Sequence, residues 1–196
     1  MAYIIPTVLE RSKHGEVSYD LYSRLLRDRI IFINGEISMD SANIILAQLL
    51  YLEKNGPKEN ISIYINSQGG AVMAGFAIHD TMRHLSCDVS TIVTGLALSM
   101  GAFILSSGTK GKRFALPNST ILIHQPLLTI SDTLQTSDLE IQTRESVRTK
   151  KLLNSYLAKY TGQSVSRIEK DSDRDKWMSA KEAKDYGIID KVLSIS

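Results

Sequence analysis

A strand that turns directly into a helix is indicated by the sequence Ile61-Ser-Ile-Tyr-Ile-Asn-Ser-Gln-Gly-Gly70. Isoleucine stands at every second position, which is the period of a β-strand with one buried face. The glycine pair permits a sharp turn, and the pattern beyond it predicts a helix over about residues 72–84. Residues 89–94 predict the next strand, and Gly95 leads toward a helix that begins near Ser99. This alternation of strands and helices favours an α/β fold with largely parallel strands.

The same alternation continues on both sides of this stretch. Before this stretch, the sequence predicts a turn at His14-Gly15 between two short extended pieces, a buried strand over 29–33 that stops at Asn34-Gly35, and a helix over 40–54. After it, the sequence predicts a hairpin turn at Lys110-Gly-Lys112, a strand over 120–123 and a long amphipathic helix over 137–160. The capping box Ser179-Ala-Lys-Glu182 then predicts the start of a helix that Gly187 stops, and a closing strand is predicted over 188–193. No linker or repeat interrupts the pattern, so we expect one domain over residues 1–196.

Composition excludes several classes of function. The 196 residues carry 23 basic and 21 acidic side chains, a formal charge of +2, and the basic residues form no stripe that would favour nucleic acid. No apolar run approaches the length of a membrane span, and the N-terminus has no secretory signal, so we expect a soluble, cytoplasmic protein. Cys87 is the single cysteine, which rules out an intrachain disulfide, and the four histidines show no zinc-like spacing with it. We therefore predict no metal.

Ser99 is the first candidate for chemistry, within Ala97-Leu-Ser-Met-Gly101. This segment lies between a predicted strand and a predicted helix and approximates a nucleophile elbow, with Ala97 in place of the first glycine. Small neighbours allow a tight turn and let a substrate carbonyl approach the hydroxyl. A serine at a helix start is also a common N-cap, so the residues alone leave a simple capping role open.

His124 and an acidic run form the second and third candidates. The apolar strand Ile121-Leu-Ile ends on His124, and Pro126 prevents its regular continuation. An imidazole, whose ordinary pKa is about 6.5, can accept a hydroxyl proton at neutral pH, although a lone histidine can be purely structural. Asp171, Asp173 and Asp175 could orient a histidine or form a solvated loop. Metal binding is less favoured, because the glycine and distant glutamate of an EF-hand are absent.

The glycine pair in Ser67-Gln-Gly-Gly70 is a fourth candidate. Glycine permits positive φ and a close backbone approach to a ligand, so an N–H at this turn is a candidate for half of an oxyanion hole. Phosphate binding is the rival, but neither G-x-x-x-x-G-K-[ST] nor G-x-G-x-x-G is present. A structural turn also remains open.

The order of these motifs resembles the ClpP family, the proteolytic subunits of Clp proteases. The resemblance covers nearly the whole chain and is carried by Tyr64-Ile-Asn-Ser-Gln-Gly-Gly70, Gly95-Leu-Ala-Leu-Ser-Met-Gly101, Lys112-Arg-Phe-Ala-Leu-Pro-Asn118, Ile123-His-Gln-Pro126, Asp173-Arg-Asp175 and Tyr186-Gly-Ile-Ile-Asp190. It implies a ClpP/crotonase-like ββα spiral with a protruding handle helix over residues 137–160. It also implies an axial-loop segment over residues 1–18.

The resemblance assigns roles to individual residues. It implies a catalytic triad of Ser99, His124 and Asp175, with the acid chosen by the family's [DE]-R-D-x-aromatic pattern. It implies an oxyanion hole from the backbone N–H groups of Gly70 and Met100. The other implied roles are contacts between rings for Asp173 and Arg174, and unfoldase docking for Tyr64, Ile92 and Leu116.

The implied activity is hydrolysis of peptide bonds in unfolded proteins inside a tetradecameric chamber of two stacked heptamers. A partner AAA+ unfoldase such as ClpX or ClpC would feed the chamber and use the ATP, so this chain is expected to hold no cofactor. Gln68 replaces the family's usual proline, Leu98 replaces an alanine, Ser62 replaces a common aromatic residue, and residues 127–134 lack the usual glycines. These departures suggest a diverged paralogue that works beside a second ClpP subunit.

Two rival functions remain open at this point. A crotonase-type acyl-CoA enzyme shares the spiral fold and a glycine-turn oxyanion hole, but it does not require the serine, histidine and aspartate motifs. A structural or regulatory ring subunit, with a weak or unassembled site, is the second rival.

Overall fold

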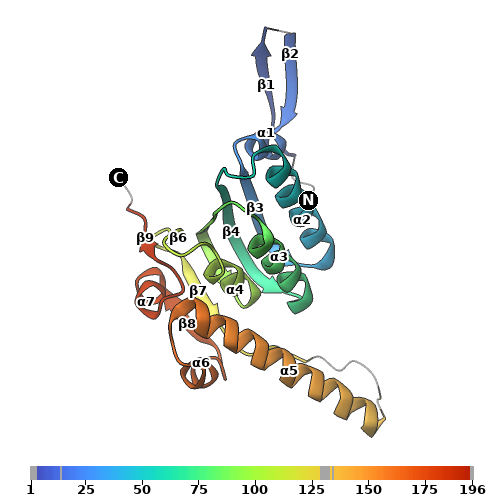
Figure 1. Cartoon of the computed structure of the whole chain (residues 1–196), viewed down its shortest axis with the longest axis vertical. Helices are drawn as coiled ribbons and strands as arrows, with labels where there is room; N and C mark the ends of the chain where they lie inside the picture. Colours follow the sequence, from blue (N-terminus) through green and yellow to red (C-terminus); the bar gives the residue numbers. More distant parts are fainter. Residues whose placement is uncertain (1–3, 14, 129–132, 134, 195–196) are drawn as a thin grey trace.

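The computed structural model describes residues 4–13, 15–128, 133 and 135–194. At its N-terminal end, β1 (Thr7–Ser12) and β2 (Gly15–Asp20) form an antiparallel hairpin, followed by α1 (Leu21–Arg27). The hairpin projects from the body of the molecule, as Figure 1 shows. Two short extended pieces were expected here, but His14 of the predicted turn lies outside the described residues, as do residues 1–3 of the predicted axial segment.

A mostly parallel seven-stranded sheet occupies the centre of the molecule. Its main path runs β3 (Ile30–Ile37), β4 (Ile61–Gly70), β5 (Val89–Leu98), β6 (Arg113–Ala115) and β9 (Lys191–Val192), all parallel. The alternating isoleucines of β4 are fully buried, as their period predicts. The predicted α/β fold is therefore confirmed.

The last part of β5 changes its partner. Residues 91–93 pair with β6, whereas residues 96–98 pair with β7 (Thr120–Ile123), and Gly95 lies between them at φ +142°. β7 in turn pairs antiparallel with β8 (Lys176–Ser179). The ends of β5 and β7 consequently lie side by side at one edge of the sheet, which is where the candidate site forms.

The helices follow the predicted order. They are α2 (Met39–Asn55), α3 (Val72–His84), α4 (Met100–Ser106), α5 (Thr136–Thr161), α6 (Val165–Asp171) and α7 (Ala180–Tyr186). α2, α3 and α4 contribute to the buried core, whereas α5 extends away from the body (Figure 1). α5 buries apolar residues only toward its C-terminal end. No helix in the described part of the chain has the length and apolar character needed to cross a membrane.

Three local predictions are wrong. The turn at Lys110-Gly-Lys112 does not form a hairpin, because it leads from α4 into β6, which runs parallel to β5. β3 does not stop at Asn34-Gly35 but continues past an irregularity in register to Ile37. The closing strand is only Lys191–Val192 rather than 188–193.

A buried ion pair joins β6 to the segment before β9. Arg113, 1% exposed, donates from Nη2 to Asp190 Oδ1 at 2.6 Å and from Nε to Oδ2 at 2.9 Å. Its Nη1 donates to the carbonyls of Ser106 and Tyr160. Burial alone would raise the pKa of Asp190, but the hydrogen bonds and charge of Arg113 outweigh it and lower that pKa to about 2. The cost of burying the charges of Arg113 and Asp190 is therefore offset by their hydrogen bonds and by their attraction to each other.

Candidate active site

Ser99 occupies a strained turn between β5 and α4. Its backbone has φ 54° and ψ −118°, a conformation that a residue other than glycine rarely adopts. Its N–H donates to the carbonyl of Leu122 in β7 at 2.9 Å, and its side chain makes no capping hydrogen bond to α4. Ser99 is thus placed at the N-cap position without acting as a side-chain cap.

Small residues make room for this turn. A Cβ on Gly69 would lie 2.6 Å from the carbonyl oxygen of Leu98 and 2.8 Å from Cβ of Ser99, at a φ of +92°. A Cβ on Gly101 would lie 3.1 Å from the carbonyl oxygen of Ser67. The predicted requirement for small neighbours is therefore met from two sides, and Gly69 is the more closely packed of the two.

His124 and Asp175 meet through the pairing of β7 with β8. Ile123 is opposite Lys176 in the antiparallel register, so the residues immediately beyond this pair lie next to each other. Nδ1 of His124 lies 3.1 Å from Oδ1 of Asp175, and the His124 side chain is 19% exposed. This contact leaves Nε2 of His124 available for a second partner.

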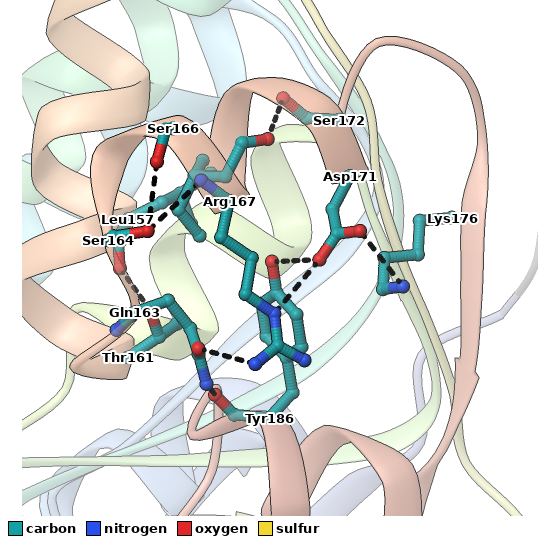
Figure 2. A network of polar contacts seen from close by, with 11 residues as sticks. Leu157, Thr161, Gln163, Ser164, Ser166, Arg167, Asp171, Ser172, Lys176 and Tyr186 are labelled. Carbon is teal, nitrogen blue, oxygen red and sulfur yellow. Dashed lines mark hydrogen bonds and ion pairs between the residues drawn. The ribbon is translucent and has the colours of Figure 1, made fainter.

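A polar network fastens the segment that carries Asp175 (Figure 2). Asp171, at the end of α6, accepts a hydrogen bond from the Tyr186 hydroxyl at 3.0 Å and lies 3.5 Å from Nζ of Lys176. Arg167 forms an ion pair with the same carboxylate. Burial opposes ionisation of Asp171, but Tyr186 and Lys176 together lower its pKa. Residues 172–175 are therefore held at both ends, by α6 and by β8.

The other members of the acidic run have different surroundings. Gln125 donates from Nε2 to the carbonyl of Asp173 at 2.8 Å, and Nζ of Lys150 lies 4.0 Å from the Asp173 carboxylate. Arg174 is exposed and has no polar partner within the described residues. The run is thus neither a free loop nor one cluster: Asp171 braces α7, Asp173 lies against Gln125, and Asp175 contacts His124.

A cavity of about 420 Å³ brings the candidate residues together. Ser99, His124, Asp175 and Gly70 all line it. Gln68 and Leu98, two of the four departures from the family pattern, also form part of its wall. The apolar part of the wall consists of Val72, Leu98, Leu122, Pro126, Leu127 and Trp177. Such a lining suits an apolar side chain of a ligand beside the Ser99 hydroxyl.

The two residues predicted to form an oxyanion hole lie near Ser99: Gly70 lines the same cavity, and Met100 directly follows Ser99 in the chain. Met100 is the first residue of α4, so its N–H is among those that have no acceptor within the helix. Gly70 ends β4 at φ +154°, and a Cβ there would lie 2.3 Å from the carbonyl oxygen of Ile37. Backbone packing therefore requires glycine at residue 70.

Two of the three predicted docking residues lie on adjacent strands, and the third directly follows a strand. Tyr64 in β4 pairs with Ile92 in β5, and Leu116 follows β6. Tyr64 stacks on Phe32, with ring centroids 5.7 Å apart. Ile92 is only 5% exposed, whereas Leu116 is 39% exposed, so any partner would contact mainly Tyr64 and Leu116 in this form of the chain.

Sequence reasoning missed part of the cavity. Trp177 was used only to recognise the acidic motif, yet it lies opposite Leu122 in the register and is 57% exposed beside the site. An aromatic residue two positions after Asp175 would have indicated that Trp177 lies beside the site if a strand had been predicted there, but β8 is too short to show the period of a strand.

In the part of the chain that the structure describes, no three His, Cys, Asp or Glu side chains gather as a metal site would require.

Comparison with protein families identifies a match over most of the chain. The family model described as Clp protease matches residues 13–196. This range includes β2 through β9 and every residue of the candidate site.

Proposed function

The chain belongs to the Clp protease family, and on that premise we propose that it is a serine endopeptidase with Ser99 as nucleophile. One observation carries the proposal. Ser99 is held in a strained turn on the same cavity as His124, and His124 is hydrogen-bonded to Asp175. Backbone strain at a serine that shares a cavity with an oriented imidazole is typical of an activated serine.

The proposed reaction is acyl transfer to water. Nε2 of His124 takes the proton from the Ser99 hydroxyl while the serine oxygen forms a bond to the peptide carbon. As the resulting tetrahedral intermediate collapses, the C–N bond breaks and His124 gives the proton to the leaving amine. A water molecule, deprotonated by His124, then hydrolyses the acyl-enzyme and releases Ser99. Asp175 keeps the imidazole in the tautomer and orientation that this sequence of proton transfers requires.

The negative oxygen of the intermediate requires donors near Ser99. We assign this role to the N–H groups of Gly70 and Met100, which flank the nucleophile. The start of α4 adds its positive dipole end to this position. Loss of one such donor typically costs about 2.7–4 kcal/mol of transition-state stabilisation.

The assembly that we propose is a cytoplasmic tetradecamer of two stacked heptamers, fed by an AAA+ unfoldase such as ClpX or ClpC. The projecting half of α5 exposes Leu139, Ile141 and Val147, which supports its role as a handle between rings. Gln68 and Leu98 on the cavity wall support a diverged subunit that works beside a second ClpP paralogue. We further propose that Asp173 and Arg174 contribute to contacts between rings.

Labelling with a serine-directed phosphonate tests this function. We expect one adduct, located at Ser99 by mass spectrometry, together with cleavage of an unstructured peptide. Native mass measurement of the assembly purified from its own cell distinguishes homomeric from heteromeric rings. Lack of labelling in a confirmed tetradecamer would favour a structural subunit, and tight binding of acyl-CoA would favour the crotonase-type reaction.

Replacing Gly69 with alanine is expected to slow phosphonate labelling of Ser99 by at least about tenfold, because the new Cβ displaces the turn that carries the nucleophile. Gly111→Ala is the matched control. Gly111 has a similar φ of +87°, but a Cβ there meets nothing within 4 Å, so this variant introduces the backbone strain without the collision. Equal labelling rates in the two variants would contradict the prediction.

A further inference from the structure

A second, much smaller cavity lies behind the candidate site, between α4 and α5. It measures about 20 Å³, which is enough for about one water molecule. Ser99 and His124 line it from one side and Asn154 of α5 from the other, and most of its remaining wall is apolar. This cavity therefore connects the projecting helix with the two residues that carry the proposed proton transfer.

Asn154 has an unsatisfied polar group at this cavity. The residue is only 2% exposed, and among the described residues nothing lies within hydrogen-bonding distance of its Nδ2. Its Oδ1 is 3.5 Å from the Ser172 hydroxyl, which already donates to the carbonyl of Ile168 at 2.7 Å. A buried amide group without a hydrogen-bond partner destabilises the folded state, so a ligand that satisfies it is favoured.

Asn154 is also connected, through Ser172, to the segment that follows His124. The carbonyl of Ser172 accepts a hydrogen bond from the N–H of Gln125 at 2.7 Å, and the side chain of Gln125 accepts one from Lys150 of α5 at 2.8 Å. A change at Asn154 therefore acts near a segment that one hydrogen bond connects to α5 and another connects to Ser172.

We infer that this cavity binds one ordered water molecule, which bridges the Asn154 amide to the Ser99–His124 pair. Water suits the site because it both donates and accepts, and so satisfies either orientation of the amide. Asn154 thereby becomes a positioning residue: it restrains, through the water, the two groups between which the proton moves. This inference rests on the proposed peptidase function. It assigns α5, through Asn154, the role of positioning Ser99 and His124.

Two substitutions separate this role from simple packing. Asn154→Leu keeps the approximate shape of the side chain but removes its polar atoms, and we expect it to slow phosphonate labelling of Ser99 by about tenfold. Asn154→Gln places a longer amide where the water would be, and we expect labelling within about threefold of the wild-type rate. A structural role predicts the opposite order, because leucine relieves an unsatisfied group whereas glutamine overpacks the core.

The control is Leu157→Met, an apolar change of similar volume on the same cavity wall, which is expected to leave labelling within about twofold. Wild-type labelling rates in Asn154→Leu would overturn the inference. If that variant fails to assemble, a high-resolution crystal structure of the wild-type protein decides: density for a water between Asn154 and Ser99 or His124 supports the inference, and a dry cavity overturns it. Failure of the wild-type protein to label would instead count against the proposed function.

Discussion

Replacing His124 with alanine is expected to lower both peptide hydrolysis and phosphonate labelling of Ser99 by about 10⁶-fold. Without the imidazole, the Ser99 hydroxyl loses the proposed general base that takes its proton as it attacks. Asp175→Asn should produce a loss of about 10⁴-fold in hydrolysis as well, because the amide favours the wrong tautomer of His124. The two losses should not add, since both residues act through one proton transfer.

Matched variants make this experiment specific. His84→Ala removes an exposed histidine at the end of α3, and Asp185→Asn removes an exposed acid of α7 that has no polar partner among the described residues. Both are expected to retain the wild-type rate. Labelling is measured as a second-order rate constant, and assembly is checked by native mass. Undiminished labelling in an assembled His124→Ala variant would sink the assignment of the general base.

Asp190→Ala is expected to reduce the free energy of unfolding by about 3–5 kcal/mol, because it leaves the charge of Arg113 buried without its partner. Urea unfolding at neutral pH measures this loss, with Asp185→Ala as a control at an exposed position. Replacing both partners, as in Arg113→Met with Asp190→Leu, should recover part of the stability, since no buried charge then remains. A cost below about 1 kcal/mol for Asp190→Ala would show that water reaches Arg113 and replaces the carboxylate.

The same ion pair predicts a dependence of stability on pH. The pKa of Asp190 is about 2 in the folded protein, against an ordinary value of 3.8. The folded state therefore binds the proton less readily than the unfolded state does, and the contribution of Asp190 is fully present above about pH 4 and is lost as the pH falls toward 2. The difference between the wild-type protein and Asp190→Asn should shrink over that window. A constant difference from pH 6 to pH 2 would contradict the prediction.

The elements with a clear period were predictable from the sequence. Alternating isoleucines gave β4, the capping box gave α7, and the helix predicted over 72–84 is Val72–His84. The short elements were not, because a three-residue strand such as β6 is too brief to show a period. β6 pairs in parallel with β5 and β9, and Arg113 of β6 contacts Asp190, 77 residues later in the chain. No local pattern encodes such a contact.

The site was predictable in part for the same reasons. Ser99 was indicated by small neighbours at a strand-to-helix junction, which are local features. The choice among three aspartates was not decided by the residues, because it depends on the antiparallel pairing of β7 with β8. Asn154 carried no signal at all, since one asparagine on a long amphipathic helix is ordinary until its burial is known.

The network around Asp171 has a consequence for how the protein is made. A chain emerging from the ribosome exposes Ser99 and His124 first, while Tyr186, which fastens the end of α6, is still within the exit tunnel. The hydrogen bond from Tyr186 to Asp171, which helps to hold the segment that carries Asp175, therefore forms only after α7 has folded. Under the proposed mechanism, the nascent chain therefore lacks the contact that steadies the segment carrying Asp175 until its last helix has folded.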